Sequence, residues 1–297
     1  MVPLLMQGIP SYQLNAIQKA YLSVHDQLAR GQIGDVTEIA IEMGAGNKAD
    51  TFKDNDIVES ISWLLRDLPS NLLQAIHLTN IIIERKKTCS NCKKQVTEID
   101  EIDVINCSIE RNESSSVQDI LSLRLEELLQ TCTRAKLCNC KSADGDRTPF
   151  TVLSDIINLP NNLFVAINRT KPDSNSKLQK PILICDTPSL EGKAIAGTYK
   201  LQALAVHTGN SVKEGHFKVN VRDNDGWIVY DDMNVTRVTK ANVNSRFNQK
   251  NSVLGVYCME HHSQVLINHM QESDCIPNKW EKTHSFMENN EEQMVCL

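Results

Sequence analysis

A histidine and an aspartate stand at the two ends of one predicted β-hairpin, residues 216–231. The strand-like runs HFKVNVR and GWIVYDD are separated by the turn-forming sequence NDG. Antiparallel strands of matched length return to their starting end, so the hairpin predicts that Asp231 lies beside His216. A carboxylate on one imidazole nitrogen fixes the tautomer and leaves the other nitrogen to deprotonate a nucleophile. The alternative interpretation is an ordinary surface pair.

Two pairs of cysteines form a second candidate site. Cys89 and Cys92 make a C-x-x-C sequence, and Cys138 and Cys140 follow well downstream as C-x-C. Four thiolates at the corners of a tetrahedron are typical of structural zinc, and two close pairs on two hairpins meet that need. The spacing therefore predicts a structural Zn²⁺ site. Four unrelated reduced thiols are the alternative, because C-x-C is less typical of zinc than C-x-x-C.

The elements that must position these residues change in type along the chain. Residues 1 to about 85 read as helical, with apolar residues at helical spacing in 16–28 and again in 57–68. A short helix is predicted over 117–129, with Ser116 as its cap.

The second half of the chain is rich in predicted strands. They are separated by Gly, Asn, Asp or Pro turns. Beyond about residue 266 the sequence is polar and ends rich in glutamate, which predicts a loosely ordered tail. The predicted strands are LFVAINR, PILICD, YKLQALAVH, HFKVNVR, GWIVYDD and SVLGVYCME.

The composition of this 297-residue chain is that of a globular protein, with 41% hydrophobic and 23% charged residues. A formal net charge of -6 and the lack of any Lys/Arg cluster argue against a nucleic-acid partner. No run approaches the ~20 apolar residues of a membrane span, and the N-terminus does not resemble a signal peptide. Ten cysteines then indicate reduced thiols, so we expect an intracellular protein, cytoplasmic or nuclear.

One segment carries enough of a pattern to suggest a family. Its string is Tyr199-x-Leu201, His207-x-Gly209, Gly215-His216-Phe217, Trp227 and Tyr230-Asp231-Asp232. This string resembles the histidine box of the ubiquitin-specific proteases (peptidase C19). The resemblance implies that His216 is the general base and that Asp231 orients it. Asp232 is implied as a neighbouring catalytic acid, and His207 as a structural residue.

Other blocks follow in the family's order, over about residues 10 to 260. Residues 55–59 are similar to the acidic helix start beside the ubiquitin tail, so the resemblance implies that Asp56 and Glu59 contact ubiquitin. The cysteine pairs fall where the family's fingers carry zinc. After LFVAINR the family usually has an aromatic residue, whereas this chain has Thr170.

The resemblance implies an α+β, papain-like cysteine protease fold with a right-hand arrangement of thumb, fingers and palm, truncated at its N-terminus. The domain would occupy residues 1–265. Within it, 1–85 would be a helical thumb remnant, 86–148 zinc-bearing fingers and 149–265 a β-rich palm with the histidine box. The polar tail would occupy 266–297.

The family's nucleophile precedes all of these blocks, in an Asn- and Gly-rich box at a helix N-terminus. This chain has no cysteine before Cys89 and nothing like that box in residues 1–20. The resemblance implies thiol-dependent hydrolysis after the C-terminal glycine of ubiquitin, but we expect the chain as it stands to be inactive. The alternative function is a catalytically dead scaffold that binds ubiquitin or another partner.

Overall fold

The computed structural model describes residues 16–30, 61, 80–109, 116–130, 138–140, 148–171, 174, 176–211, 214–224 and 226–264. Asp56, Glu59 and the predicted tail from residue 266 lie outside these residues. Within them, no helix is long and apolar enough to cross a membrane.

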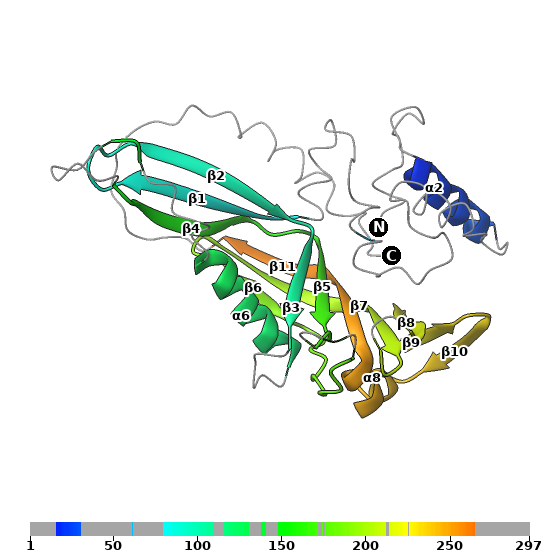
Figure 1. Cartoon of the computed structure of the whole chain (residues 1–297). Helices are drawn as coiled ribbons and strands as arrows, with labels where there is room; N and C mark the ends of the chain where they lie inside the picture. Colours follow the sequence, from blue (N-terminus) through cyan, green and yellow to red (C-terminus); the bar gives the residue numbers. More distant parts are fainter. Residues whose placement is uncertain are drawn as a thin grey trace.

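A three-stranded antiparallel sheet projects to one side of the molecule (Figure 1). Its order is β2-β1-β4, so β1 is the central strand. Every odd-numbered residue of β1 is buried, since that face of the strand turns inward. We call this the finger sheet, made of β1 (Ile81–Cys89), β2 (Gln95–Ile102) and β4 (Phe150–Asn158).

The second sheet has eight strands in the order β10-β9-β8-β7-β11-β5-β3, with β6 paired to β7. Only β3 and β5 are parallel, and the other pairs are antiparallel. Its strands are β3 (Val104–Ser108), β5 (Asn162–Asn168), β6 (Ser189–Glu191), β7 (Ile195–Thr208), β8 (His216–Asp223), β9 (Gly226–Asp231), β10 (Asn234–Val238) and β11 (Ser252–Gln264).

The central strands of the large sheet are buried on both faces, and β7 shows why. Leu204 and Val206 belong to the main core cluster, whereas Ala205 between them belongs to a smaller cluster with Phe164. Successive side chains of a strand point to opposite faces, so one strand serves two cores. Ile61 packs against the smaller cluster.

Four described helices accompany the sheets: α2 (Ala16–Ala29), α6 (Val117–Gln130), α7 (Lys240–Val243) and α8 (Arg246–Asn251). The first two match the predicted helices. Ser116 caps α6 as predicted, because its Oγ accepts from the Asp119 N–H at 3.2 Å while an Asp119 carboxylate oxygen accepts from the Ser116 N–H at 3.0 Å. The buried face of α6 joins the main core cluster.

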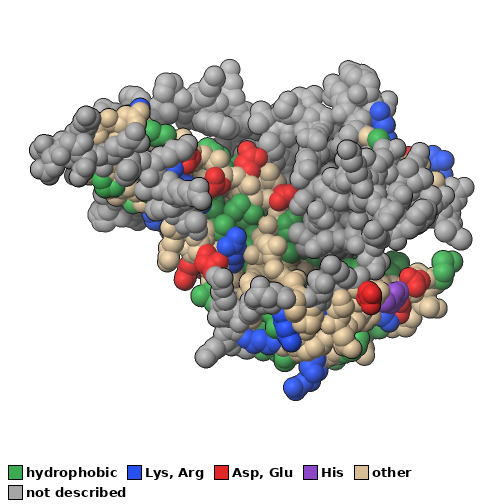
Figure 2. Space-filling model, in the orientation of Figure 1, with side chains coloured by type: hydrophobic (Ala, Val, Ile, Leu, Met, Phe, Trp, Pro, Cys, Tyr) green, Lys and Arg blue, Asp and Glu red, His purple; other side chains and the backbone are tan. Residues whose placement is uncertain are grey.

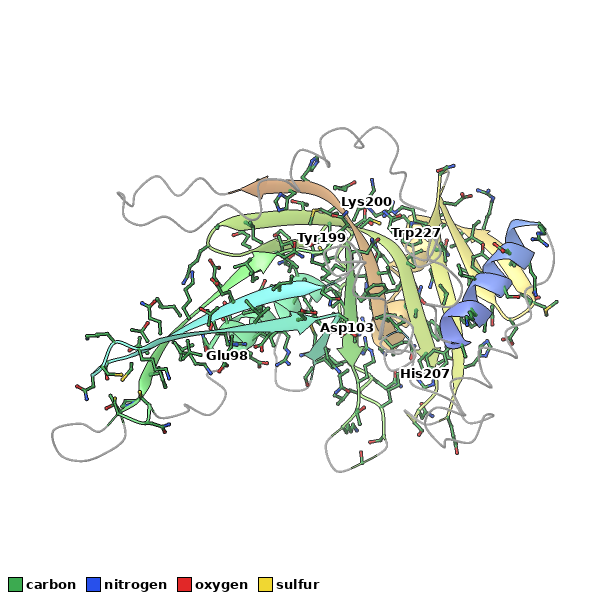
Figure 3. The ribbon with its side chains drawn as sticks, turned by 90° about the horizontal axis from the view of Figure 1, so that it is seen from above. Glu98, Asp103, Tyr199, Lys200, His207 and Trp227 are labelled. Carbon is green, nitrogen blue, oxygen red and sulfur yellow. The ribbon has the colours of Figure 1, made fainter. Side chains whose placement is uncertain are left out.

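Both sheets contain strands from the predicted segments 86–148 and 149–265. The first strand begins at Ile81, before the predicted end of the helical segment at 85. The strand β4, placed in the palm by sequence, pairs with β1 in the finger sheet, whereas β3, placed in the fingers, pairs with β5. The chain passes between the sheets at Asp103, the single residue between β2 and β3 (Figure 3). Strand pairing joins segments that are remote in sequence, which a linear division cannot represent.

The prediction of a strand at PILICD is wrong. Ile182 and Ile184 are buried, but the segment makes only an isolated bridge from Leu183 to Ser116. Its backbone instead connects two helix ends, since Val117 N–H donates to the Leu183 carbonyl at 2.9 Å and Ile182 N–H donates to the Gln249 carbonyl at 3.0 Å. A short apolar run indicates burial and does not by itself indicate a strand.

Candidate active site and metal centre

His216 and Asp231 meet at one end of the β8–β9 hairpin. His216 is the first residue of β8 and Asp231 the last of β9, and the register pairs Val219 with Tyr230. Nε2 of His216 lies 2.5 Å from Oδ1 of Asp231. The hairpin thus brings together the two residues as the strand pattern predicts.

The carboxylate binds one specific nitrogen of the ring. With Nε2 donating to Asp231, Nδ1 of His216 keeps its lone pair and can accept a proton. The second oxygen of Asp231 accepts from the ammonium of Lys218, which shares a strand face with His216. The hydrogen bond from Lys218, and then that from His216, holds the pKa of Asp231 below its usual value. Asp231 therefore remains an anion next to the imidazole.

Asp232 has a different position from Asp231. It opens the two-residue turn between β9 and β10, with a positive φ of 51° that aspartate tolerates better than most residues. Its Oδ2 lies 3.8 Å from His216 Nε2, and its side chain is 77% exposed. The ligand atoms of His216, Asp231 and Asp232 are close enough to share a metal ion. Lys218 already occupies one oxygen of Asp231. The three residues therefore fit a base with its orienting acid better than they fit a metal site.

The strand that precedes His216 approaches it closely. Gly215 has no room for a side chain, because a Cβ there would overlap the Thr208 carbonyl and the His207 ring. His207 is buried and its ring lies 4.6 Å from that of Phe217, which fits the structural role implied by the resemblance. The Thr208 hydroxyl donates to the His216 carbonyl at 3.1 Å. These contacts fix the backbone on which His216 stands.

The four predicted metal ligands lie together at the far end of the finger sheet. Cys89 ends β1 and Cys92 lies in the turn to β2, while the Cys138 N–H donates to the Thr148 carbonyl just before β4. The four sulfur atoms all lie within 4.8 Å of one another. Two separate loops thus supply the two pairs.

The sulfur distances distinguish a metal site from disulfides. Cys89 Sγ lies 3.4 Å from Cys140 Sγ, and Cys92 Sγ lies 3.6 Å from Cys138 Sγ, too far for a covalent bond. Zinc–sulfur bonds of about 2.3 Å in a tetrahedron place sulfurs about 3.8 Å apart. Hydrogen bonding with Thr148 lowers the pKa of Cys140 to about 6, whereas burial and the hydrogen bonds among the thiols raise the pKa of Cys138 to about 11, so the metal-free cluster favours a thiolate at Cys140. These residues fit a zinc ion.

The other described cysteines are not activated nucleophiles. Burial raises the pKa of Cys107 in β3 to about 12 and also raises the pKa of Cys185. Cys258 is buried in β11, where its thiol donates to the Asn162 side chain at 3.2 Å. Reactive thiols need a lowered pKa and access to substrate, which these environments do not provide. Cys132, Cys275 and Cys296 lie outside the described residues.

Sequence reasoning missed four residues that support the two sites. Thr148 beside the thiols and Lys218 beside Asp231 are single polar residues, although the i, i+2 relation of Lys218 to His216 could have suggested a shared face. Lys177, which donates to the His207 carbonyl, and Asn251, which accepts from Lys177, are remote in sequence from His216 and from each other. No local pattern indicates such contacts.

Comparisons with known proteins agree with this arrangement. The family model described as ubiquitin carboxyl-terminal hydrolase matches residues 22–267. No curated protein matches the chain. Two solved structures share its fold and confirm the predicted α+β, papain-like class, at identities that speak for the fold alone.

The first is the SAGA DUB module Ubp8/Sgf11/Sus1/Sgf73 bound to monoubiquitin, at 16% identity and a TM-score of 0.61, covering 88% of this chain and 63% of that chain. The second is the SAGA Ubp8/Sgf11/Sus1/Sgf73 DUB module bound to ubiquitin aldehyde, at 17% identity and a TM-score of 0.57, covering 86% of this chain and 61% of that chain. The chain spans less than two thirds of the length of either structure.

Proposed function

This chain belongs to the ubiquitin carboxyl-terminal hydrolase family, and on that basis we propose that it binds ubiquitin and carries the base half of a thiol-dependent deubiquitinating site. The observation that carries the proposal is the 2.5 Å contact between His216 Nε2 and Asp231 Oδ1, which leaves Nδ1 to act as base. Solved structures of the same fold hold ubiquitin or ubiquitin aldehyde.

In the complete reaction, Nδ1 of His216 takes the proton of a cysteine thiol, and the thiolate attacks the carbonyl carbon of the terminal glycine of ubiquitin. The imidazolium returns the proton to the leaving amine, and water then hydrolyses the thioester. Asp231 stays ionised throughout, because its lowered pKa keeps it an anion, and so it stabilises the imidazolium.

We propose further that this chain binds ubiquitin without cleaving it. Four of the described cysteines form the candidate metal centre, and the other three are buried or have a raised pKa. The family's nucleophile comes from a box for which the sequence of this chain offers no match. The alternative to an active hydrolase is therefore a catalytically dead scaffold that binds ubiquitin or another partner.

Two measurements test ubiquitin binding and cleavage separately. Calorimetric titration of ubiquitin into the full chain should release heat, and absence of heat at high micromolar concentration contradicts binding. A ubiquitin–fluorophore substrate should not be turned over, and ubiquitin with a C-terminal electrophile should form no adduct. Turnover abolished by His216→Ala, or an adduct mapped to one cysteine, would overturn the inactive assignment. Cys185→Ser is the matched control for nonspecific thiol labelling.

A basic partner suits the charges of the molecule. Acidic side chains gather over the finger sheet and its junction with the large sheet, on the face shown in Figure 2. We propose that Asp56 and Glu59 add carboxylates that pair with arginines of the ubiquitin tail. Changing both to Asn and Gln should weaken ubiquitin binding about a hundredfold or more, since charge-assisted bonds contribute ~1.5–3 kcal/mol each and ~1.4 kcal/mol is a factor of ten in affinity. Asp54→Asn is the control, and equal weakening by this control contradicts the assignment.

We propose that the four cysteines Cys89, Cys92, Cys138 and Cys140 hold one structural Zn²⁺, which would join the β1–β2 turn to the start of β4. Purified protein should contain about one equivalent of zinc, and Cys138→Ser should lose it and lower the melting temperature. Cys185→Ser should retain the metal. A protein that keeps its fold and melting temperature after chelation contradicts a structural role.

The free thiols also favour a reducing location, so we propose that the protein resides in the cytoplasm or nucleus. Microscopy of a fluorescent fusion tests this location.

A further inference from the structure

A buried lysine contacts the backbone that carries the candidate active site. Lys177 lies between β5 and β6 and is only 3% exposed. Its ammonium donates to the carbonyl oxygen of His207 and to Oδ1 of Asn251, the latter at 2.8 Å. A charged group removed from water is costly unless it is well hydrogen-bonded. Burial, and then the charge of Arg169, lowers its pKa to about 8. The contacts of Lys177 therefore matter to the folded state.

The carbonyl that Lys177 contacts belongs to the end of β7, next to His216. His207 pairs with Phe217 and Thr208 pairs with His216, at the last step of the β7–β8 ladder (His207 is labelled in Figure 3). The Thr208 hydroxyl also donates to the His216 carbonyl. A displacement of His207 would thus reach His216 through one hydrogen-bonded residue.

The segment around Lys177 also holds the loop that follows β7. We call residues 176–179 the clasp. The Lys177 N–H donates to the Asn210 carbonyl at 3.0 Å, and Gln179 Nε2 donates to the Gly209 carbonyl at 3.3 Å. The clasp therefore contacts this loop through backbone and side-chain bonds.

The clasp is itself tied to buried structure. Asn251 ends α8, where its Nδ2 donates to the Phe247 carbonyl at 2.9 Å. Arg169, just after β5, is 2% exposed and donates to the carbonyls of Leu178 at 3.3 Å, of Ser252 at 2.7 Å and of Gln249 at 2.6 Å. These bonds connect the clasp to α8 and to the first residue of β11, so it has a fixed base.

We propose that Lys177 is a positioning residue, which sets the place of His216 by holding the His207 carbonyl against Asn251. An apolar side chain of similar length would fill the same space without the cost of burying a charge. Only a donor, however, can direct the carbonyl at the end of β7. The catalytic meaning rests on the proposed role of His216, but the position of the ring can be measured without ubiquitin.

The test observes the imidazole of His216 directly. The full chain is labelled with ¹⁵N-histidine, and the ring signals of His216 are assigned with His216→Gln. In the unchanged protein at pH 8, the bond from Nε2 to Asp231 fixes one tautomer, so the two ring ¹⁵N signals should be widely separated. In Lys177→Met the ring should exchange between tautomers, and the two signals should move toward each other.

Two further variants keep the test decisive. Leu125→Ala in α6 is the control, because it creates a buried cavity far from β8 and should lower the melting temperature without moving the His216 signals. Asn251→Ala is the milder clasp variant, to be used if Lys177→Met does not fold, and it should also reduce the separation. Unchanged His216 signals in a folded clasp variant, or an equal change in Leu125→Ala, would overturn the proposal. Ubiquitin binding does not enter this readout, so its failure would be a separate result.

Discussion

Nε2 of His216 lies 2.5 Å from Oδ1 of Asp231, and the other oxygen of Asp231 binds Lys218. One carboxylate therefore accepts from an imidazole and from an ammonium group across the β8–β9 hairpin. The ring is held through Nε2, so Nδ1 is the nitrogen whose lone pair stays available. This orientation supports the proposed role of His216 as a base.

The stability that Asp231 contributes should depend on pH. Its pKa is lower in the folded protein than the usual value near ~3.9, so its contribution is present above that value and lost as the pH falls through the folded pKa. We expect Asp231→Asn to lower the free energy of unfolding at pH 6, and the difference from the unchanged protein to shrink in strong acid. Urea unfolding over a pH series measures this.

Asp232→Asn serves as the control for this prediction, because its side chain is 77% exposed and lies 3.8 Å from His216. A deficit in Asp231→Asn that persists undiminished at the most acid pH would contradict the assigned charge pairing.

Gly215 should tolerate no side chain. Its Cβ would overlap the Thr208 carbonyl and the His207 ring, so Gly215→Ala should displace the start of β8 and destabilise the protein by about 1–3 kcal/mol. Chemical denaturation and the His216 ring signals report the two effects. Met233→Ala, at an 80% exposed position in the adjacent turn, should change neither. If Gly215→Ala matched Met233→Ala, the close approach of the two strands would be wrong.

Arg85 should contribute much more to stability than its neighbour Lys86. The Arg85 side chain is 4% exposed and donates to Asp100 at 2.6 Å, to Ser154 at 3.0 Å and to the Leu128 carbonyl at 2.8 Å. Arg85→Ala leaves these acceptors without their donor and should cost about 2–3 kcal/mol. The Lys86 side chain is 64% exposed. Lys86→Ala should therefore lower the free energy of unfolding by at most ~0.5 kcal/mol.

Thermal or urea unfolding of the two variants measures the Arg85 prediction. Because Arg85 connects all three strands of the finger sheet with α6, equal losses in the two variants would mean that these elements do not depend on it.

Lys177 should make stability rise with pH in the alkaline range. Its pKa is about 8 in the folded protein and near ~10.4 in an unfolded chain, so between these values the unfolded state binds more protons. Folding then becomes more favourable as the pH rises. The slope of unfolding free energy against pH from 8 to 10 should be smaller in Lys177→Met. Identical slopes would show that folding does not lower the pKa of Lys177.

Local sequence determined the parts of this protein whose partners are near in the chain. The runs on either side of NDG alternate in character, and so they specified the hairpin that joins His216 to Asp231. Ser116 and Asp119 likewise specified the start of α6. The spacing of the cysteines likewise places Cys89 near Cys92 and Cys138 near Cys140, because the members of each pair are close in sequence.

Tertiary structure alone decided the parts that join distant segments. Nothing near Lys177 in sequence indicates His207 or Asn251, and nothing near Arg85 indicates Leu128. The change of sheet at Asp103 likewise depends on which strands pair. The run PILICD has the sequence of a strand, but its backbone groups form hydrogen bonds with α6 and α8 instead. Local patterns record alternation and turns, whereas a buried polar group is placed by whichever remote acceptor satisfies it, because leaving it unsatisfied costs free energy.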